Sequence, residues 1–245
     1  DFLILNESVG GYDNDGGLQS MRTEAGAGAV EAAYSGGLVN SFGGGLGSMP
    51  IVTYRNNGGT PNDIHDRLQD LILRARLQRA TGRHDNHVAL TAGAASGADA
   101  EPIATDLIAR WLDAIVADRG ASGIERVVRN KPAEAVDTCW LQDRRRIVEP
   151  LDANPRARCN LAYPLASAPR IVAGLPFEND ILKCRLRPLR ADDYPSRPDA
   201  MQLDRLRKVF PLGVCDGRQA GVGQRPPRGT YLLLPLKSGG AVPVG

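Results

Sequence analysis

Aromatic residues, histidines and long apolar runs are scarce in this chain, and each scarcity limits what the protein can be. Only 5% of the 245 residues are aromatic, and only three are histidine. No apolar run approaches the ~18 residues of a membrane-spanning helix, so we expect no membrane span. The formal charge is only +2, and the densest arginine run, Arg144 to Arg146, has no interleaved aromatic residues. This pattern argues against a nucleic-acid-binding surface.

Glycine and proline are abundant instead, with 28 and 17 residues. Their combined share exceeds the usual ~12% and indicates a loop-rich protein. Hydrophobic residues, at 42%, are still numerous enough for a core. The chain begins at Asp1 without a methionine, and the run from Phe2 to Leu5 reads like the middle of a fold. We therefore expect a processed product or a fragment with a further segment upstream.

The four cysteines lie in the C-terminal part of the chain, and none forms the C-x-x-C pair of a zinc or thioredoxin-type site. An even number in an irregular region indicates two disulfides and an exported protein. Four free thiols in a cytosolic protein are the alternative. Of the three possible pairings we expect Cys139–Cys159 and Cys184–Cys215, because each pair brackets a polar loop.

Hydrophobic periodicity predicts an alternation of helices and strands in residues 1–130. Apolar spacing of three and four residues indicates a helix over 63–80, ended by Thr81 and Gly82, and another over 103–118, opened by Pro102. Residues 51–54 and 88–91 read as short buried strands, and 23–34 as a helix that stops at Gly36. The order strand, helix, strand, helix predicts an α/β protein with a parallel sheet.

The predicted inward faces of the two long helices are specific. In the first, Leu68, Leu71 and Ile72 share the main apolar face, whereas Leu73 and Leu77 lie opposite. In the second, we expect Ile103 to point inward together with the residues Leu107, Ile108, Trp111 and Ile115. Beyond residue 130 periodicity fades and prolines recur. We interpret 1–130 as the core and 131–245 as an irregular, disulfide-stapled extension packed on it.

The loop after the first predicted strand carries the most distinctive polar cluster. It places His65 between two carboxylates, Asp63 and Asp66. Open α/β sheets build their sites at the carboxyl ends of strands. An imidazole there can act as a general base, with a nearby carboxylate fixing its tautomer. The alternative is that Asp63 merely caps the following helix and His65 is an ordinary residue of its first turn.

Other candidate residues carry weaker signals. His84 and His87 precede the second predicted strand, and we expect both to be surface residues. The nearest approximation to the G-x-S-x-G nucleophile elbow surrounds Ser35, but it follows a predicted helix instead of a strand. Ser35 therefore reads as a helix end, and the chain contains no convincing nucleophile.

The segment from Gly10 to Gly17 spaces Asp13 and Asp15 like a calcium loop, without the bidentate glutamate of an EF-hand. A tight polar turn is the default interpretation, with Asp13 and Asp15 as weak calcium candidates. An acid from this segment could also serve His65. We expect no cofactor.

Several motifs together resemble a secreted bacterial family of unknown function that is similar to α/β-hydrolases of the tannase, feruloyl esterase and polyhydroxyalkanoate-depolymerase kind. The matching motifs are GGYDNDG (Gly10–Gly16), GGGLGSMPIVTYR (Gly43–Arg55), NDIHDR (Asn62–Arg67), DTCW (Asp137–Trp140), ARCNLAYP (Ala157–Pro164), NDILKCRLRPL with ADDYP (Asn179–Pro195), and FPLGVCD with GVGQ (Phe210–Gln224). The resemblance covers nearly the whole chain but only the C-terminal half of such a protein. It implies that the serine nucleophile lies upstream, as a segment or a separate chain, and that NDIHDR supplies the catalytic histidine.

These observations lead to one favoured hypothesis and two alternatives. The favoured one is a secreted or periplasmic serine hydrolase that cleaves carboxylic esters, oligomeric or polymeric ones included, as a heterodimer with the upstream half. His65 would be the general base, and Asp63 or Asp66 would orient it. The alternatives are an amidase or peptidase matured by chain cleavage, and a non-catalytic exported calcium-binding protein.

Overall fold

The computed structural model describes residues 26–40, 45–60, 63, 65–93, 100–166, 168–172 and 174–227, together with two short strands at 233–235 and 241–243. The described residues form two compact units, one between 41 and 167 and the other comprising those before 41 and after 167. The boundary expected near residue 130 falls inside the first unit, between α5 (Gly123–Arg129) and β3 (Thr138–Trp140).

The first unit contains a four-stranded sheet with the order β1-β2-β3-β4. Its other strands are β1 (Ile51–Asn56), β2 (His87–Ala92) and β4 (Arg146–Val148). β1, β2 and β3 run parallel, and β4 pairs antiparallel with β3. The predicted strands and their parallel pairing are confirmed, and each strand extends one or two residues beyond its predicted ends.

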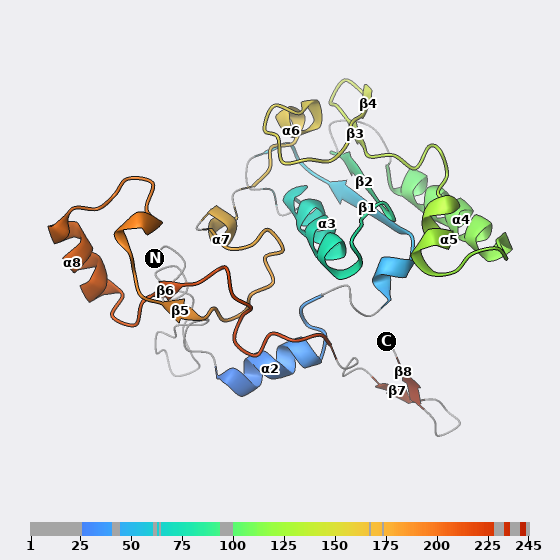
Figure 1. The fold of residues 1–245 in the computed structure, drawn as a ribbon. Coiled ribbons are helices and arrows are strands. Elements are labelled where there is room, and N and C mark those ends of the chain that lie inside the picture. Colours follow the sequence, from blue (N-terminus) through green and yellow to red (C-terminus); the bar gives the residue numbers. More distant parts are fainter. Residues whose placement is uncertain are drawn as a thin grey trace. The chain divides into compact units, whose positions relative to one another are not determined.

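β2 is buried along its whole length because helices cover both faces of the sheet (Figure 1). Side chains alternate between the two faces of a strand. Val88 and Leu90 join a core cluster with Leu107 and Trp111 of α4 (Ala100–Ala117). The side chain of His87 contacts α3 (Leu68–Thr81) instead. An uninterrupted buried strand of this kind is typical of the centre of a parallel sheet.

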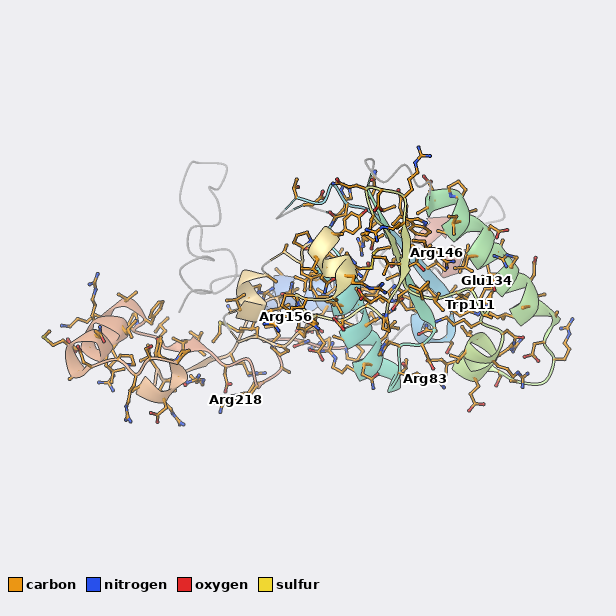
Figure 2. All side chains as sticks on the ribbon, turned by 90° about the horizontal axis from the view of Figure 1, so that it is seen from above. Arg83, Trp111, Glu134, Arg146, Arg156 and Arg218 are labelled. Atoms are coloured by element: carbon orange, nitrogen blue, oxygen red, sulfur yellow. A yellow bond between two sulfur atoms is a disulfide. The ribbon has the colours of Figure 1, made fainter. Side chains whose placement is uncertain are left out.

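Trp111 of α4 anchors this core (Figure 2). Its ring is fully buried, and its Nε1 donates a 2.8 Å hydrogen bond to the carbonyl of Val127 in α5. The helix begins at Ala100, and its apolar stripe passes through Ala104. The prediction that Ile103 points inward is therefore wrong: Ala104 occupies the sheet-facing position beside it, and Ile103 is 44% exposed.

α3 begins at Leu68, five residues after the predicted start at Asp63. The reason is that the carboxylate of Asp63 binds backbone amides of the preceding loop, as described below. Leu68 and Ile72 are buried as predicted, and the helix ends with Gly82 in the left-handed region, also as predicted. Leu77, which the pattern assigned to a secondary face, is completely buried.

A largely buried ion pair fixes α3 to the sheet. Arg74 binds Asp137 through both terminal nitrogens, at 2.6 and 2.8 Å. The same carboxylate accepts hydrogen bonds from the backbone N–H groups of Ala89 and Leu151. Burial alone would raise the pKa of Asp137, but the bonds from Arg74 and the two amides hold the pKa below its usual range. One carboxylate thus joins a helix, a strand and the segment after β4.

The imidazole of His87 lies beside this pair and is 1% exposed, so the prediction of a surface residue is wrong for His87, whereas it holds for His84. Arg74 Nε donates to His87 Nδ1 at 2.9 Å, which leaves the proton on Nε2 to bond Thr53 Oγ1, also at 2.9 Å. Burial, and secondarily the charge of Arg74, lowers the pKa of His87 from 6.5 to about 3. The buried ring is therefore neutral.

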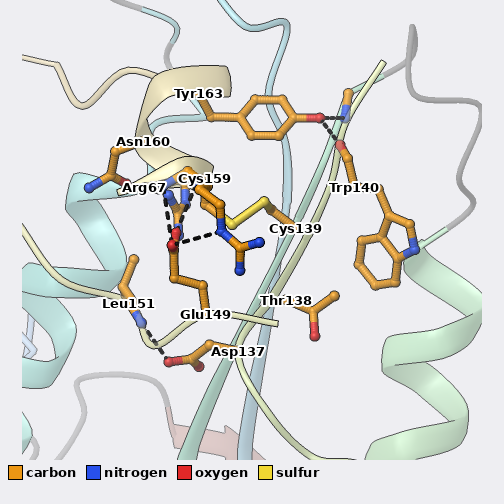
Figure 3. The surroundings of a disulfide bond; sticks show 12 residues. Arg67, Asp137, Thr138, Cys139, Trp140, Glu149, Leu151, Cys159, Asn160 and Tyr163 are labelled. Carbon is orange, nitrogen blue, oxygen red and sulfur yellow. Dashed lines mark hydrogen bonds and ion pairs between the residues drawn. A yellow bond between two sulfur atoms is a disulfide. The ribbon is translucent and has the colours of Figure 1, made fainter. Parts of the chain in front are cut away.

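Both predicted disulfides are present. Cys139–Cys159 joins β3 to α6 (Arg158–Ala162), and Glu149 accepts a 2.9 Å hydrogen bond from the backbone N–H of Cys159 (Figure 3). Cys184–Cys215 closes the two-stranded sheet of β5 (Leu186–Arg187) and β6 (Val214–Cys215) in the second unit.

The described part of the second unit consists of short elements. The helix predicted to stop at Gly36 is α2 (Ala27–Ser35), and its Tyr34 hydroxyl donates to the carbonyl of Asp180 and accepts from the amide of Leu182. The remaining elements of the described residues are η1 (Leu46–Ser48), in the first unit, and α7 (Pro169–Val172), η3 (Ala191–Asp193), α8 (Ala200–Val209), β7 (Leu233–Pro235) and β8 (Ala241–Pro243).

We expect Asp137→Ala to destabilise the first unit by about 3–5 kcal/mol, because it leaves the largely buried charge of Arg74 without an opposing charge. Asp106→Ala, which removes an exposed ion pair with Arg110, should cost no more than about 0.5 kcal/mol. Both tryptophans of the chain, Trp111 and Trp140, lie in this unit, so urea unfolding followed by tryptophan fluorescence reports on it. Equal losses in the two variants would contradict the proposed role of Asp137.

Acid should destabilise the same unit through His87. Between pH 6.5 and about 3 the unfolded chain binds a proton at this site that the folded chain does not, so stability falls as the pH is lowered. The slope from this one group is about 1.4 kcal/mol per pH unit. Urea unfolding across this range should give a shallower pH dependence for His87→Gln than for the wild type. Parallel curves would show that His87 does not titrate in this way.

Candidate functional site

The loop that carries His65 is anchored where β1 and β2 end. These strands are parallel, so their carboxyl ends lie at the same edge of the sheet. Asn57, the first residue after β1, is completely buried, and its backbone N–H donates to the carbonyl of Ala92 at 3.0 Å. Its side chain accepts from the amide of Gly59 at 2.8 Å and donates to the carbonyl of His65 at 3.4 Å. One buried asparagine thus fixes both arms of the loop.

Asp63 holds the imidazole of His65. Its Oδ2 accepts from the backbone N–H of Gly58 at 2.7 Å, and its Oδ1 accepts from the backbone N–H of His65 at 2.8 Å. The same Oδ1 lies 3.2 Å from His65 Nδ1. The hydrogen bond from the His65 amide, followed by the one from Gly58, lowers the pKa of Asp63. An ionised carboxylate only accepts hydrogen bonds, so this contact places the ring proton on Nδ1.

The geometry leaves the opposite ring nitrogen available. The His65 side chain is 55% exposed, whereas that of Asp63 is 15% exposed. With the proton on Nδ1, Nε2 carries the lone pair and can accept a proton from a group outside the loop. The arrangement resembles that of a histidine base and its orienting acid in a catalytic triad.

Asp66 has a different role in the structure. It is 4% exposed, and its Oδ1 accepts from the amide of Leu68, the first residue of α3, at 2.7 Å. Its Oδ2 accepts from the backbone N–H of Ala166. The helix-capping function considered for Asp63 is therefore carried out by Asp66, and of the two carboxylates it is Asp63 that contacts the His65 ring.

Tyr163 connects the other strand ends at this edge. Its hydroxyl accepts a 3.2 Å hydrogen bond from the amide of Gly93 and donates to the carbonyl of Trp140, at the ends of β2 and β3 (Figure 3). Gly93 also lies against Asn57, because a Cβ at this position would lie 2.2 Å from the Asn57 carbonyl oxygen. The ends of three parallel strands are thus held together under the His65 loop.

Neither Asn57 nor Tyr163 was predicted from the sequence as part of the site. A signal for Asn57 was present, since asparagine followed by two glycines directly after a strand favours a side-chain-stabilised turn. No local pattern marks Tyr163, because its partners lie far away in sequence.

In the described part of the first unit, no side-chain hydroxyl or thiol is bonded to the His65 imidazole. The hydrogen-bond partner of the imidazole in these residues is Asp63. All four cysteines are in disulfides and so are excluded. Ser35 is the last residue of α2 and belongs to the other unit.

The calcium candidates Asp13 and Asp15 lie outside the described residues. Elsewhere, the described ranges contain no group of three or more histidine, cysteine or carboxylate side chains arranged to hold a metal ion. Nor do these ranges include a helix that is both long and apolar enough to cross a membrane.

The fold and site define a mixed α/β protein with a histidine–aspartate pair on a loop at the carboxyl edge of a mostly parallel sheet. The chain matches the tannase-like family of unknown function (DUF6351) over residues 1–226, and it belongs to this family. No curated protein and no solved structure matches it.

The contact between Asp63 and His65 should determine which nitrogen of the neutral ring carries the proton. Nitrogen-15 chemical shifts of His65 above neutral pH should indicate a proton on Nδ1 in the wild type. In Asp63→Ala the proton should move largely to Nε2, the form that free histidine prefers. The His84 ring, whose partner is Gln78, should give unchanged shifts in both proteins. An unchanged His65 tautomer in the variant would show that Asp63 does not orient the ring.

Proposed function

We propose that this chain is part of a secreted serine hydrolase of the α/β-hydrolase type that cleaves carboxylic esters. The observation that carries the proposal is the exposed imidazole of His65, held at Nδ1 by Asp63 at the carboxyl edge of a parallel sheet. Membership of a tannase-like family supports hydrolysis of an ester bond. The two disulfides are typical of extracellular proteins and support export.

The nucleophile in this proposal is a serine on an upstream segment or on a second chain that associates with this one. Its Oγ attacks the acyl carbon, and the Oγ proton passes to His65 Nε2. When the tetrahedral intermediate collapses, the bond between the acyl carbon and the ester oxygen breaks, and Nε2 returns its proton to the leaving alcohol. Asp63 stabilises the imidazolium that exists between these two transfers.

The second half of the cycle uses the same two residues of this chain. A water molecule gives a proton to His65 Nε2 and attacks the acyl-enzyme, and the regenerated serine takes that proton as the carboxylic acid leaves. Backbone N–H groups that stabilise the oxyanion would come from the upstream segment. The part of the site in this chain therefore supplies proton transfer, whereas the upstream part supplies the nucleophile and the oxyanion hole.

His65→Ala should lower the turnover of ester substrates at least about 100-fold, the usual cost of losing a general base. His84→Ala removes an exposed histidine with a glutamine partner and should leave turnover unchanged. Both variants are measured with short p-nitrophenyl esters in preparations that retain any chain co-purifying with this one. Near-normal turnover in His65→Ala would exclude His65 as the base.

A fluorophosphonate probe tests the nucleophile independently of substrate choice. The labelled peptide, identified by mass spectrometry, should belong to an upstream segment or to a co-purifying chain. Labelling of Ser35 would place the nucleophile within this chain and contradict the division proposed above. Absence of label together with absence of ester or amide turnover would favour a non-catalytic binding protein instead.

A further inference from the structure

A small pocket adjoins the candidate site at the carboxyl edge of the sheet. It has a volume of about 280 Å³. Its lining comes from the segment after β3 and from the end of α6, and it comprises Leu141, Gln142, Asp143, Ala162 and Tyr163. None of these residues takes part in the proton transfers proposed above.

Two contacts connect the wall of the pocket with the His65 loop and with the strand end beside it. The carbonyl oxygen of Ala162 lies 3.3 Å from where a Cβ on Gly59 would be, and Gly59 is bonded to the Asn57 side chain that also holds the His65 carbonyl. Tyr163 meets the end of β2 through its hydrogen bond from Gly93. The pocket wall and the His65 loop therefore rest on the same strand ends.

The Cys139–Cys159 disulfide fixes the two walls relative to each other. Cys139 lies in β3, two residues before Leu141, and Cys159 lies in α6, three residues before Ala162. Both sulfurs are buried in a cluster that includes Tyr163. A pocket whose opposite walls are covalently joined has a defined size, which is a requirement for discriminating among substrates.

The lining has an apolar floor and a polar rim. Leu141, Ala162 and the Tyr163 ring supply apolar surface, whereas Gln142 and Asp143 are exposed. The amide of Arg145, followed by its guanidinium, lowers the pKa of Asp143, so this side chain is ionised at neutral pH. The guanidinium of Arg145 forms an ion pair with this carboxylate but is not part of the lining, so Asp143 is the charged side chain among the lining residues. A negatively charged ligand group would meet a carboxylate at the rim.

The size of the pocket limits the ligand further. A volume of 280 Å³ is just below the range of ~300–1,000 Å³ found for pockets that hold drug-sized ligands. It suits one small substituent, such as a single six-membered ring, and not a whole extended ester.

We propose that this pocket is a substrate subsite that binds one small, uncharged or cationic group of the ester and rejects carboxylates. The role of the pocket as a subsite rests on the proposed hydrolase function, whereas binding of the isolated small group does not depend on that function. Leu141 and Ala162 would contact its apolar part, and Gln142 and Asp143 would accept hydrogen bonds from a hydroxyl or ammonium group.

Three probes of equal size separate these requirements: cyclohexylmethanol, cyclohexylmethylammonium and cyclohexanecarboxylate. Saturation-transfer NMR with the full chain at pH 7 should detect binding of the first two at millimolar concentration. The carboxylate should bind at least about 10-fold more weakly. Equal binding of all three, or of none, would overturn the assignment.

Three variants test the location of binding. Ala162→Leu fills the pocket and should abolish binding of the alcohol, whereas Leu161→Ala, at the neighbouring residue that is 67% exposed, should leave it unchanged. Asp143→Asn removes an exposed charge without altering shape, and it should raise the affinity of the carboxylate to that of the alcohol. If Asp143→Asn still bound the carboxylate more weakly than the alcohol, as in the wild type, the assignment would be overturned even if Ala162→Leu failed to fold.

The ester assay on the same preparations distinguishes failure of this proposal from failure of the hydrolase proposal. Probe binding that follows the predicted pattern without any ester turnover would retain the small-molecule site and reject the subsite role. Ester turnover without probe binding would reject the pocket alone. His65→Ala should bind the alcohol normally while losing turnover, because the pocket and the base are separate parts of the edge.

Discussion

The ion pair between Arg74 and Asp137 is the interaction on which the first unit most depends. Asp137 accepts four hydrogen bonds, two from Arg74 in α3 and one each from the amides of Ala89 and Leu151. Burying a carboxylate costs free energy unless its oxygens accept hydrogen bonds. Here the hydrogen bonds come from the opposing charge on α3, from β2 and from the segment after β4. The pair therefore sets the position of α3 against the sheet. Because the His65 loop leads directly into α3, the ion pair also sets the position at which that loop ends.

This network and the candidate site lie at opposite ends of the same strands. His87 is the first residue of β2, and Asp137 directly precedes β3, so the ionic network lies at the amino ends. Asn57 and Gly93 follow the carboxyl ends of β1 and β2. The Arg74–Asp137 network is thus remote from the edge that carries His65. That edge has stabilising contacts of its own, including the ion pair between Arg55, near the end of β1, and the buried Asp70.

Periodicity was sufficient to predict β1, β2, their parallel pairing and the helices α2, α3 and α4, because burial of one helix face or of a whole central strand leaves a local pattern. The short strands β3 and β4 lie beyond residue 130 and were not predicted. It misplaced the start of α3 and the orientation of Ile103, since both depend on competition among nearby residues. At the start of α3, the carboxylate of Asp66 caps the helix while Asp63 binds the loop. Both residues are aspartates within four positions, and sequence alone does not tell which of them takes which role.

The prediction that His87 is a surface residue was wrong for a related reason. A histidine before a strand is usually solvated, and its burial became favourable only because Arg74 and Thr53 satisfy both ring nitrogens. Arg74 is thirteen residues away and Thr53 is thirty-four, and neither spacing is a recognisable signal. The disulfide pairing, by contrast, was predictable because each bridge closes a short segment.

The candidate site owes its precision to backbone groups more than to side-chain packing. Asn57 and Asp63 together bond the amides of Gly58, Gly59 and His65, so a loop of glycines and small polar residues is held by its own side chains. Each of those bonds orders the loop before any ligand binds. Substrate binding therefore does not have to offset the loss of conformational entropy that ordering the loop entails. The same carboxylate that orders the loop also meets the His65 ring. Coupling these two functions in Asp63 explains how a short, exposed loop can present an imidazole in one tautomer and one orientation, which is the condition for using it as a base.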